Sequence, residues 1–416
     1  MSTPPKIPEV FILWHPDCPL GEQLAKRIYA WLRPGNGVGP QVFYRSLPAA
    51  EAGGLPPPLP KEKKRAAEKI TSAVGSAKVS NLQILLPLID QHMVADPAWR
   101  YWLSELSNIP PEEQEIMPVA LDTTAYNMPG KMRRQNYLRP IGLPLADDAT
   151  TGMAFEAATR SLLKQLTEAM CRLLLRAPEA GPNNGRSALA ALPKVTLFLS
   201  HAKVDGTGPA KRLRNYIYSQ TQLAAFYDEN DIVFGGDFGE EIENALGASN
   251  MAAMIVIRSA QYANRPWCRR ELSLFRKPRR IRDDRMERWQ LFPTLVVEAL
   301  DERESSLGIP ELGNSSLIRW SQDRHIEEQI VTTVMRDAML AAFHTVRGAE
   351  LHKASHQIII NWLPDPTTML HILTDHPHAQ ELDVVYPGRG LSGLELKIMR
   401  EFFPQITFHS FEEVSA

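Results

Sequence analysis

Short apolar runs alternate along most of the chain with segments of helical spacing. The run Val10–Trp14 has the length of a strand, and residues 21–32 follow it with apolar positions at Leu24 and Ile28. Spacings of three and four residues place such side chains on one face of a helix. The alternation continues to a long amphipathic helix expected over 151–177. Strands and helices in this order predict a parallel sheet covered by helices on both faces.

The same order of elements starts again after residues 178–193, which are small, polar and rich in turn formers and which we interpret as a linker. Four segments of the first block have counterparts in the second: VFILWHPD corresponds to TLFLSHAK, QVFYRS to AAFYDE, RYWLSEL to PWCRREL, and IMPVAL to FPTLVVEAL. Each block also ends in a long helix. We therefore predict one α/β unit used twice.

A third, shorter block follows, with strand character at 357–360, 382–386 and 406–408 and helical spacing at 367–374 and 394–402. It predicts a small α/β module. The predicted organisation is a first domain over 1–177, a linker over 178–193, a second domain with a trailing long helix over 194–347, and the C-terminal module over 348–416.

Composition narrows the class of protein. The formal net charge is −2, which excludes a globally basic nucleic-acid binder. Three scattered cysteines are too few for a disulfide framework or a four-thiolate zinc site, and they favour a reduced, cytoplasmic location. No apolar run approaches the roughly 20 residues that span a bilayer, so we expect no membrane association. The N-terminus lacks the charged and apolar regions of a secretory signal.

The second block carries several motifs in a fixed order. Its first strand ends in Phe198-Leu-Ser-His-Ala202, and its second in Phe226-Tyr-Asp-Glu-Asn-Asp-Ile232. The loop Phe234-Gly-Gly-Asp-Phe238 follows, and then IVIRSAQYANRPWCRREL over 255–272. Together these motifs resemble the TIR (Toll/interleukin-1 receptor) domain family. The resemblance implies a flavodoxin-like α/β fold. Many members hydrolyse NAD+ at the nicotinamide glycosidic bond, whereas others only assemble signalling complexes.

Ligands of parallel sheets bind outside the carboxyl ends of the strands. The candidate substrate-binding residues are therefore those expected at this edge: Ser200, His201, Asp231, Phe234, Gly235 and Trp267. The resemblance places the family's catalytic glutamate at Glu271. Trp267 and Glu271 are four residues apart, hence on one face of a helix, where an indole can pack a nicotinamide ring and a carboxylate can bind ribose hydroxyls.

The chemistry of the bond asks for such a carboxylate independently. Cleavage generates an oxocarbenium-like ribose, as in glycoside hydrolysis. Nicotinamide leaves from a cationic ring, so no general acid is needed, and one carboxylate that orients the ribose and offsets positive charge suffices. The hypothesis needs NAD+ as substrate, with no cofactor and no metal.

Other residues have simpler interpretations. Ser200 and His201 are adjacent on a strand and point to opposite faces, so they do not form a nucleophile–base pair. Cys268, flanked by Arg269 and Arg270, suits either a nucleophile or a small packing residue of the helix, and we favour packing. The run Arg276–Arg282 is expected in a solvated loop, and the histidines near the C-terminus give only a weak indication of a metal site. The Gly-rich turn 386–393 suits either phosphate binding or a tight turn.

The first block departs from the family pattern, with Trp14-His15-Pro16 where the second has Ser200-His201-Ala202. In the sequence comparison Glu105 aligns with Glu271. We expect a degenerate, catalytically silent TIR-like domain that serves assembly or partner binding.

The leading hypothesis is an NAD+ nucleosidase that acts as a TIR effector in prokaryotic antiviral defence. The resemblance implies self-association through TIR domains and activation by oligomerisation, a protein or a nucleic-acid partner. Two alternatives stay open: a non-catalytic TIR scaffold for signalling assembly, and a cyclase that makes a cyclic ADP-ribose signal.

Overall fold

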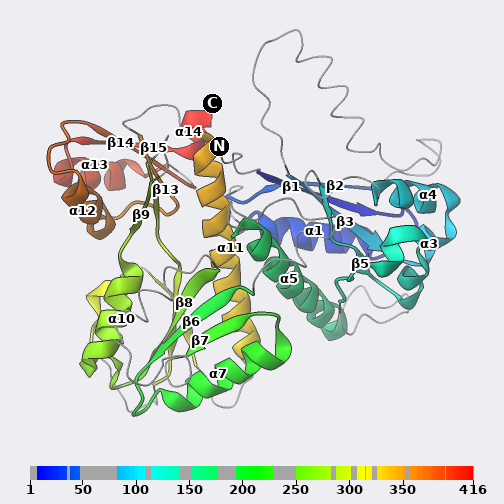
Figure 1. Ribbon diagram of the computed structural model, residues 1–416, viewed down its shortest axis with the longest axis horizontal. Coiled ribbons are helices and arrows are strands. Elements are labelled where there is room, and N and C mark those ends of the chain that lie inside the picture. The colour runs from blue at the N-terminus through cyan, green and yellow to red at the C-terminus, as the bar shows by residue number, and fades with distance from the viewer. Residues whose placement is uncertain are drawn as a thin grey trace, which may run out of the picture. The chain divides into compact units, whose positions relative to one another are not determined.

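The computed structural model describes most of the chain (Figure 1). The described residues are 7–34, 38–46, 82–107, 114–140, 152–175, 194–227, 250–282, 287–300, 307–313, 315–320, 326–351, 357–388 and 390–415. The chain divides into two compact units. The N-terminal unit comprises Lys6–Leu166 with Gly181–Ala191, and the C-terminal unit comprises Met1–Pro5, Thr167–Ala180 and Leu192–Ala416.

The N-terminal unit is built on a parallel sheet of order β2-β1-β3-β4, with β5 also paired to β3. Its strands are β1 (Pro8–Trp14), β2 (Gln41–Arg45), β3 (Leu82–Ile89), β4 (Gln114–Ile116) and β5 (Val119–Ala120). Its helices are α1 (Gly21–Leu32), α3 (Gln91–Ala95), α4 (Pro97–Leu106), η1 (Thr123–Asn127) and η2 (Gly130–Arg134), and α5 (Met153–Leu174) begins within it. Buried side chains of β3 and the indole of Trp99 supply much of the core.

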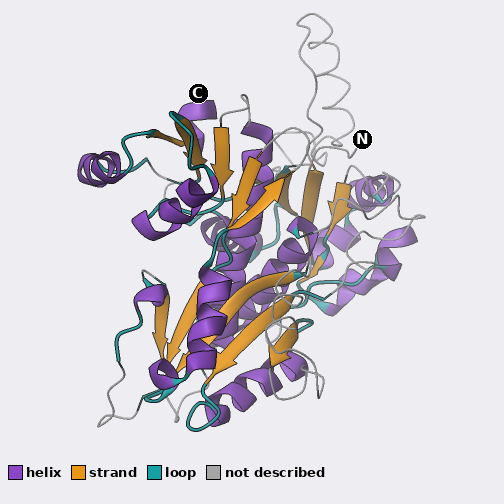
Figure 2. Cartoon of the chain, turned by 60° about the vertical axis from the view of Figure 1, so that its left-hand side comes forward, coloured by secondary structure: helices purple, strands orange, loops and turns teal. Residues whose placement is uncertain are grey.

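The C-terminal unit contains two sheets, of which the first, the middle sheet, has the order β12-β11-β8-β6-β7 and is parallel throughout. Its strands are β6 (Thr196–His201), β7 (Ala224–Tyr227), β8 (Met251–Arg258), β11 (Thr294–Glu298) and β12 (Ser316–Arg319). After β6 the chain continues to β7 at one edge of the sheet, and after β8 it continues to β11 toward the other edge. Right-handed crossovers therefore place α7 (Thr207–Gln220) and α10 (Pro266–Arg276) on opposite faces. Figure 2 shows helices on both sides of this sheet.

The second sheet, the C-terminal sheet, has the order β15-β14-β13-β10-β9 and is parallel except at its β9 edge. Its strands are β13 (Gln357–Ile360), β14 (Leu382–Tyr386), β15 (Ile406–Ser410) and the hairpin strands β9 (Arg279–Arg282) and β10 (Glu287–Gln290). Its helices are α12 (Pro366–Asp375), α13 (Gly393–Phe402) and α14 (Phe411–Ser415). The hairpin comes from within the segment that forms the middle sheet.

The expectation of a solvated loop over Arg276–Arg282 is therefore wrong for the residues of β9. Two of its guanidinium groups contact aromatic rings: Arg279 lies 5.0 Å from the ring centroid of Phe292, and Arg280 5.9 Å from that of Trp289. Such cation–π contacts let a basic segment pack against the protein as an edge strand.

A polar network ties this hairpin to α12. The Glu287 carboxylate accepts hydrogen bonds from the Trp289 indole at 2.7 Å and from Arg280 at 2.5 Å, and it lies 3.1 Å from Nε2 of His376. Burial alone raises the pKa of Glu287. The hydrogen bonds from Trp289, Arg280 and His376 outweigh burial and hold that pKa below its ordinary value.

This network predicts acid sensitivity of the C-terminal sheet. A carboxyl group whose pKa is lower in the folded state stabilises the fold above its unfolded pKa, near 4.3. That contribution disappears as the pH falls below this value toward the folded pKa. Urea unfolding at several pH values tests this assignment. Between about pH 5 and pH 3, the free energy of unfolding is expected to fall less in Glu287→Gln than in wild type. Parallel pH profiles for the two proteins would contradict this assignment.

Helix α11 (Glu327–Leu351) packs against both sheets of the C-terminal unit, contacting β8 and β11 of the middle sheet and β10 and β13 of the C-terminal sheet. Near its end, Gly348 lies against the side chains of Ile359 and Phe411. A side chain at this position would collide with them. The glycine is therefore what lets the last turns of α11 lie close to the C-terminal sheet.

The predicted α/β class with flavodoxin-like parallel sheets is confirmed. The apolar spacing also predicts helices over 61–73 and 238–248, and both ranges lie outside the described residues. The predicted domain boundaries stay predictions, although two strands of the C-terminal sheet come from residues before 348. Within the described part of the chain, no helix is both long and apolar enough to span a membrane.

Candidate functional site

Three buried polar side chains, which we call the polar trio, meet where the carboxyl end of β6 faces α10. The hydroxyl of Ser200 donates to Oε2 of Glu271 at 2.6 Å and lies 2.7 Å from the hydroxyl of Tyr262. Ser200 is 1% exposed, Tyr262 0% and Glu271 5%. Ser200 comes from β6, Tyr262 from the 3-10 turn η4 (Tyr262–Asn264), and Glu271 from the middle of α10. The site thus depends on three separate segments of the chain.

The direction of the hydrogen bonds follows from the protons available. Ser200 has one hydroxyl proton, which it donates to the carboxylate, so Tyr262 must donate to Ser200. Burial raises the pKa of Tyr262 well above its usual value, which keeps the phenol protonated. Tyr262 and Ser200 therefore form a chain of donors directed at Glu271. Such a chain compensates part of the cost of burying the carboxylate.

The hydrogen bonds from Tyr262 to Ser200 and from Ser200 to Glu271 predict that Ser200→Val is less stable than wild type. Valine cannot donate, so the Glu271 carboxylate loses a buried hydrogen bond, which costs about 1–3 kcal/mol of unfolding free energy. Urea unfolding measures the difference. Ser273→Ala is the control, because the exposed Ser273 hydroxyl donates to the backbone carbonyl of Arg269 within α10 and not to a buried carboxylate. Equal stabilities of Ser200→Val and wild type would contradict a structural role for the bond.

Trp267 lies one turn before Glu271 on α10 and is 51% exposed. The guanidinium of Arg270 lies 5.4 Å from its ring centroid. The two residues therefore lie in different environments. Glu271 reaches into the buried region, while the Trp267 indole lies at the surface beside the Arg270 guanidinium.

His201 is the last residue of β6 and is 5% exposed. Its Cβ lies near the position that a Cβ on Gly206 would take, at the start of α7, whereas Ser200 bonds Tyr262 and Glu271 on the α10 side. The two neighbouring side chains therefore point to opposite faces, as the strand geometry predicts. The carbonyl of His201 accepts from Cys268, whose sulfur lies 3.4 Å away in the hydrophobic core.

A second contact joins the loops at the same edge. The Asp205 carboxylate, after β6, accepts from the Ser259 hydroxyl at 2.6 Å and from the Gln261 backbone N–H at 2.8 Å, both after β8. It fixes the loop that leads to Tyr262. Asp231, Phe234 and Gly235, the other predicted substrate contacts, lie outside the described residues.

Sequence reasoning missed Tyr262 as a member of this site. Its signal was present, because the motif over 255–272 contains this tyrosine between the strand and the Trp-Cys pair. Only the folded chain shows that its hydroxyl turns back to β6.

The geometry defines a class: a flavodoxin-like α/β domain with a buried carboxylate at the carboxyl edge of its first strand. Residues 197–331, from β6 into α11, match the family model of the TIR domain. The chain therefore contains a TIR domain. A comparison with curated proteins found no match.

The N-terminal sheet repeats the topology of the TIR domain, with the first strand between the second and the third. The connections 90–96 and 259–265 have the same length, and both lead into a helix that begins with proline, Pro97 or Pro266. Buried positions then agree along the two helices. In this register Trp102, not Glu105, takes the place of Glu271, so the alignment of Glu105 with Glu271 is three residues off.

The same register replaces the entire polar trio by apolar residues. The pairing of β1 with β3 places Leu13 where β6 has Ser200, so the expected correspondence of Trp14 with Ser200 is one residue off. Met93 takes the place of Tyr262. Leu13, Met93 and Trp102 belong to one buried hydrophobic cluster. Burying a carboxylate without its hydrogen-bond donors, or the donors without the carboxylate, destabilises the fold, so the three residues are expected to change together. That this unit is a degenerate TIR-like domain stays a prediction.

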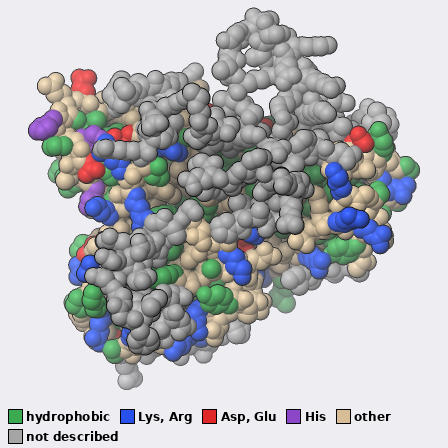
Figure 3. All heavy atoms as spheres, in the orientation of Figure 1, with side chains coloured by type: hydrophobic (Ala, Val, Ile, Leu, Met, Phe, Trp, Pro, Cys, Tyr) green, Lys and Arg blue, Asp and Glu red, His purple; other side chains and the backbone are tan. Residues whose placement is uncertain are grey.

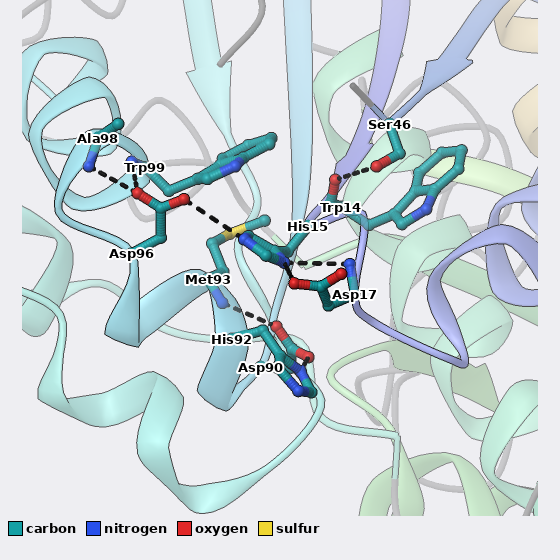
Figure 4. A network of polar contacts seen from close by, with 10 residues as sticks. All are labelled: Trp14, His15, Asp17, Ser46, Asp90, His92, Met93, Asp96, Ala98 and Trp99. Carbon is teal, nitrogen blue, oxygen red and sulfur yellow. Dashed lines mark hydrogen bonds and ion pairs between the residues drawn. The ribbon is translucent and has the colours of Figure 1, made fainter. Parts of the chain in front are cut away.

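The carboxyl edge of the N-terminal sheet carries a different polar network (Figure 4). Nδ1 of His15 accepts from the Asp17 N–H at 3.1 Å, so Nε2 carries the proton that faces Asp96 at 3.4 Å. Asp96 also caps α4, and Asp90 caps α3 and contacts His92 at 2.7 Å. These groups bond one another and the helix N-termini, and so hold the ends of the strands in place.

The remaining candidates have structural explanations. At the Gly-rich turn, Ser392 and Glu395 form a capping box at the N-terminus of α13. The Glu395 carboxylate therefore accepts a backbone N–H at the place where a phosphate would bind. Among the described residues no group of three or more His, Cys, Asp or Glu side chains can hold a metal ion. On the face drawn in Figure 3, Lys and Arg side chains occur in separate groups.

Proposed function

We propose that the TIR domain hydrolyses NAD+ at the N-glycosidic bond to nicotinamide, with Glu271 as the catalytic carboxylate. The observation that carries this proposal is the hydrogen bond of Glu271 with Ser200 at the carboxyl edge of β6. This is the edge at which parallel α/β sheets bind ligands. The carboxylate is fixed in direction and largely dry, which strengthens its interaction with a developing positive charge.

In the proposed reaction the bond between ribose C1′ and the nicotinamide nitrogen breaks, and its electron pair goes to the pyridine ring. The ring loses its positive charge and leaves as neutral nicotinamide. Glu271 stabilises the oxocarbenium-like ribose that forms. Water adds to C1′ and releases a proton, so NAD+ and water give nicotinamide, ADP-ribose and H+. The exposed indole of Trp267, near the N-terminus of α10, is proposed to pack against the nicotinamide ring.

We further propose that the chain is a cytoplasmic effector of prokaryotic antiviral defence, activated by self-association or by a partner. The resemblance to TIR enzymes supports this role. A connection within the C-terminal unit supports regulation: only Lys277 and Pro278 separate α10, which carries Glu271, from β9 of the C-terminal sheet. Binding that shifts this sheet would move the end of the catalytic helix.

One observation favours the non-catalytic scaffold as a second candidate. Glu271 is 5% exposed, and its bond to Ser200 is also what a purely structural buried carboxylate would make. In that case the polar trio only braces β6 against α10.

Nicotinamide release from NAD+ by the purified full-length chain distinguishes the candidates. We expect turnover that rises more than linearly with protein concentration, because association completes the site. Chromatography of the second product separates hydrolysis, which gives ADP-ribose, from cyclisation. No release at any protein concentration, or with infected-cell extract added as activator, would leave the scaffold as the function.

A further inference from the structure

Helix α13 has two apolar faces, and among the described residues only one of these faces packs into a hydrophobic core. Met399 and Phe403 at its end are buried in the core of the C-terminal sheet. On the other side Leu394 is 69% exposed, Ile398 39% and Phe402 67%. We call these three residues the α13 stripe.

The stripe has the spacing of a helix-docking surface. Its members are four residues apart, so they form a row along one side of the helix. A helix that serves only its own sheet has polar residues on its outer side. Single exposed apolar residues are ordinary, but a row of large ones marks an interaction site.

Charges beside the stripe indicate what covers it. Lys397 and Glu401 lie on the same flank of the row, one turn apart, and both are exposed. Neither forms an ion pair with another described residue. A partner helix that approaches this flank is favoured when it places an acid near Lys397 and a base near Glu401, because like charges there would repel.

A second copy of α13 in antiparallel orientation meets this requirement. A twofold axis at Ile398 places Leu394 of one copy opposite Phe402 of the other, so a smaller side chain faces a larger one. Rotation about that axis keeps each flank on its own side. With a rise of about 1.5 Å per residue, Lys397 of one copy then lies about 3 Å along the axis from Glu401 of the other, and the reverse pair forms equally. The two Lys397 residues are also about 3 Å apart along the axis, so two attractive pairs stand against one repulsive pair.

We propose that the α13 stripe is a self-association surface through which two copies of this chain pair antiparallel about Ile398. The surface lies on the C-terminal module, outside the segment that matches the TIR domain, and the inference does not rest on the proposed NAD+ hydrolysis. One helix pair is smaller than the interface of a stable dimer. The association is therefore weak and depends on protein concentration.

Sedimentation velocity of the full-length chain over a wide concentration range tests the proposal. We expect wild type to dimerise reversibly, and Phe402→Asp to weaken dimerisation by at least about tenfold, because it places a charge in the apolar row. The control is Leu370→Asp, a similarly exposed leucine on α12 outside the stripe. Leu370→Asp is expected to dimerise like wild type.

Charge reversal identifies the partner. Lys397→Glu and Glu401→Lys are each expected to weaken self-association, because like charges then face each other across the axis. Mixing the two variants restores dimers, since every opposed pair in the mixed dimer has opposite charges. The double variant K397E/E401K dimerises like wild type.

Three results would overturn the proposal: wild type that stays monomeric throughout, equal weakening by Leu370→Asp and Phe402→Asp, or a mixture of the reversed variants that stays monomeric. Circular dichroism of each variant establishes that the fold is retained. The last result, with wild type dimeric, would assign the dimer to another surface and the stripe to a different partner.

Discussion

Glu271→Gln is expected to lower nicotinamide release from NAD+ by about 10²–10³-fold, the range found when one preorganised electrostatic group is removed from an active site. Glutamine has nearly the same shape, and its amide oxygen can still accept the hydrogen bond from Ser200. The substitution therefore removes the negative charge while the carboxyl edge of β6 keeps its structure. The expected loss is in kcat, because the charge that Glu271 offsets develops only in the transition state.

The matched control is Glu105→Gln. Glu105 lies on α4 of the N-terminal unit, where the register of the two helices places Trp102, not Glu105, at the position of Glu271. It is expected to leave turnover unchanged. Full turnover in Glu271→Gln, with the fold intact by circular dichroism, would exclude Glu271 as the catalytic carboxylate.

Gly348→Leu is expected to destabilise the C-terminal unit by about 3 kcal/mol, at the upper end of the usual cost of overpacking a core. A Cβ at this position would lie 2.2 Å from Cγ2 of Ile359 and 3.1 Å from Cζ of Phe411. Ile359 is β-branched and buried in a strand, so it has little freedom to move away. Urea unfolding of the full-length chain measures the loss.

Helix propensity gives the opposite expectation and so makes the test decisive. Replacing a helical glycine by alanine usually stabilises a helix by up to about 1 kcal/mol. Gly393, the first residue of α13, has open space around it, so Gly393→Ala is expected to be neutral or stabilising. Gly348→Ala is expected to destabilise in spite of propensity. Stabilisation by Gly348→Ala would show that α11 does not pack closely on β13.

Much of the fold could be predicted because its strands are short apolar runs and its helices have a clear apolar face. The strands β1, β6 and β8 lie close to the runs 10–14, 195–199 and 252–257 in which the pattern predicts strands. The helices α1, α10 and α11 lie close to the predicted ranges 21–32, 267–275 and 325–346. The strands that the pattern missed include edge strands. β12 is largely exposed, and β9 carries three arginines, so neither has the apolar run that marks a buried strand.

The candidate site could be predicted only in part. The motif over 255–272 pointed to Glu271 and its helix, and the role of Glu271 in catalysis stays a prediction. The contribution of Tyr262 could not be read, because its phenol bonds a residue 62 positions away. The alignment of Glu105 with Glu271 failed for a related reason: a glutamate one turn further along a helix looks equivalent in sequence, but only the burial pattern fixes the register.

The sequence alone determined the α/β class, the repeated order of elements, and the family resemblance of the middle segment, because these depend on local periodicity and on motifs that are continuous in the chain. Tertiary structure decided which polar groups are buried together. Ser200, Tyr262 and Glu271 form one hydrogen-bonded chain only when β6, η4 and α10 pack, and their counterparts Leu13, Met93 and Trp102 form an apolar cluster in the same arrangement. Long-range contacts of this kind produce no periodic pattern in the sequence, because burial and hydrogen bonding are properties of the packed chain.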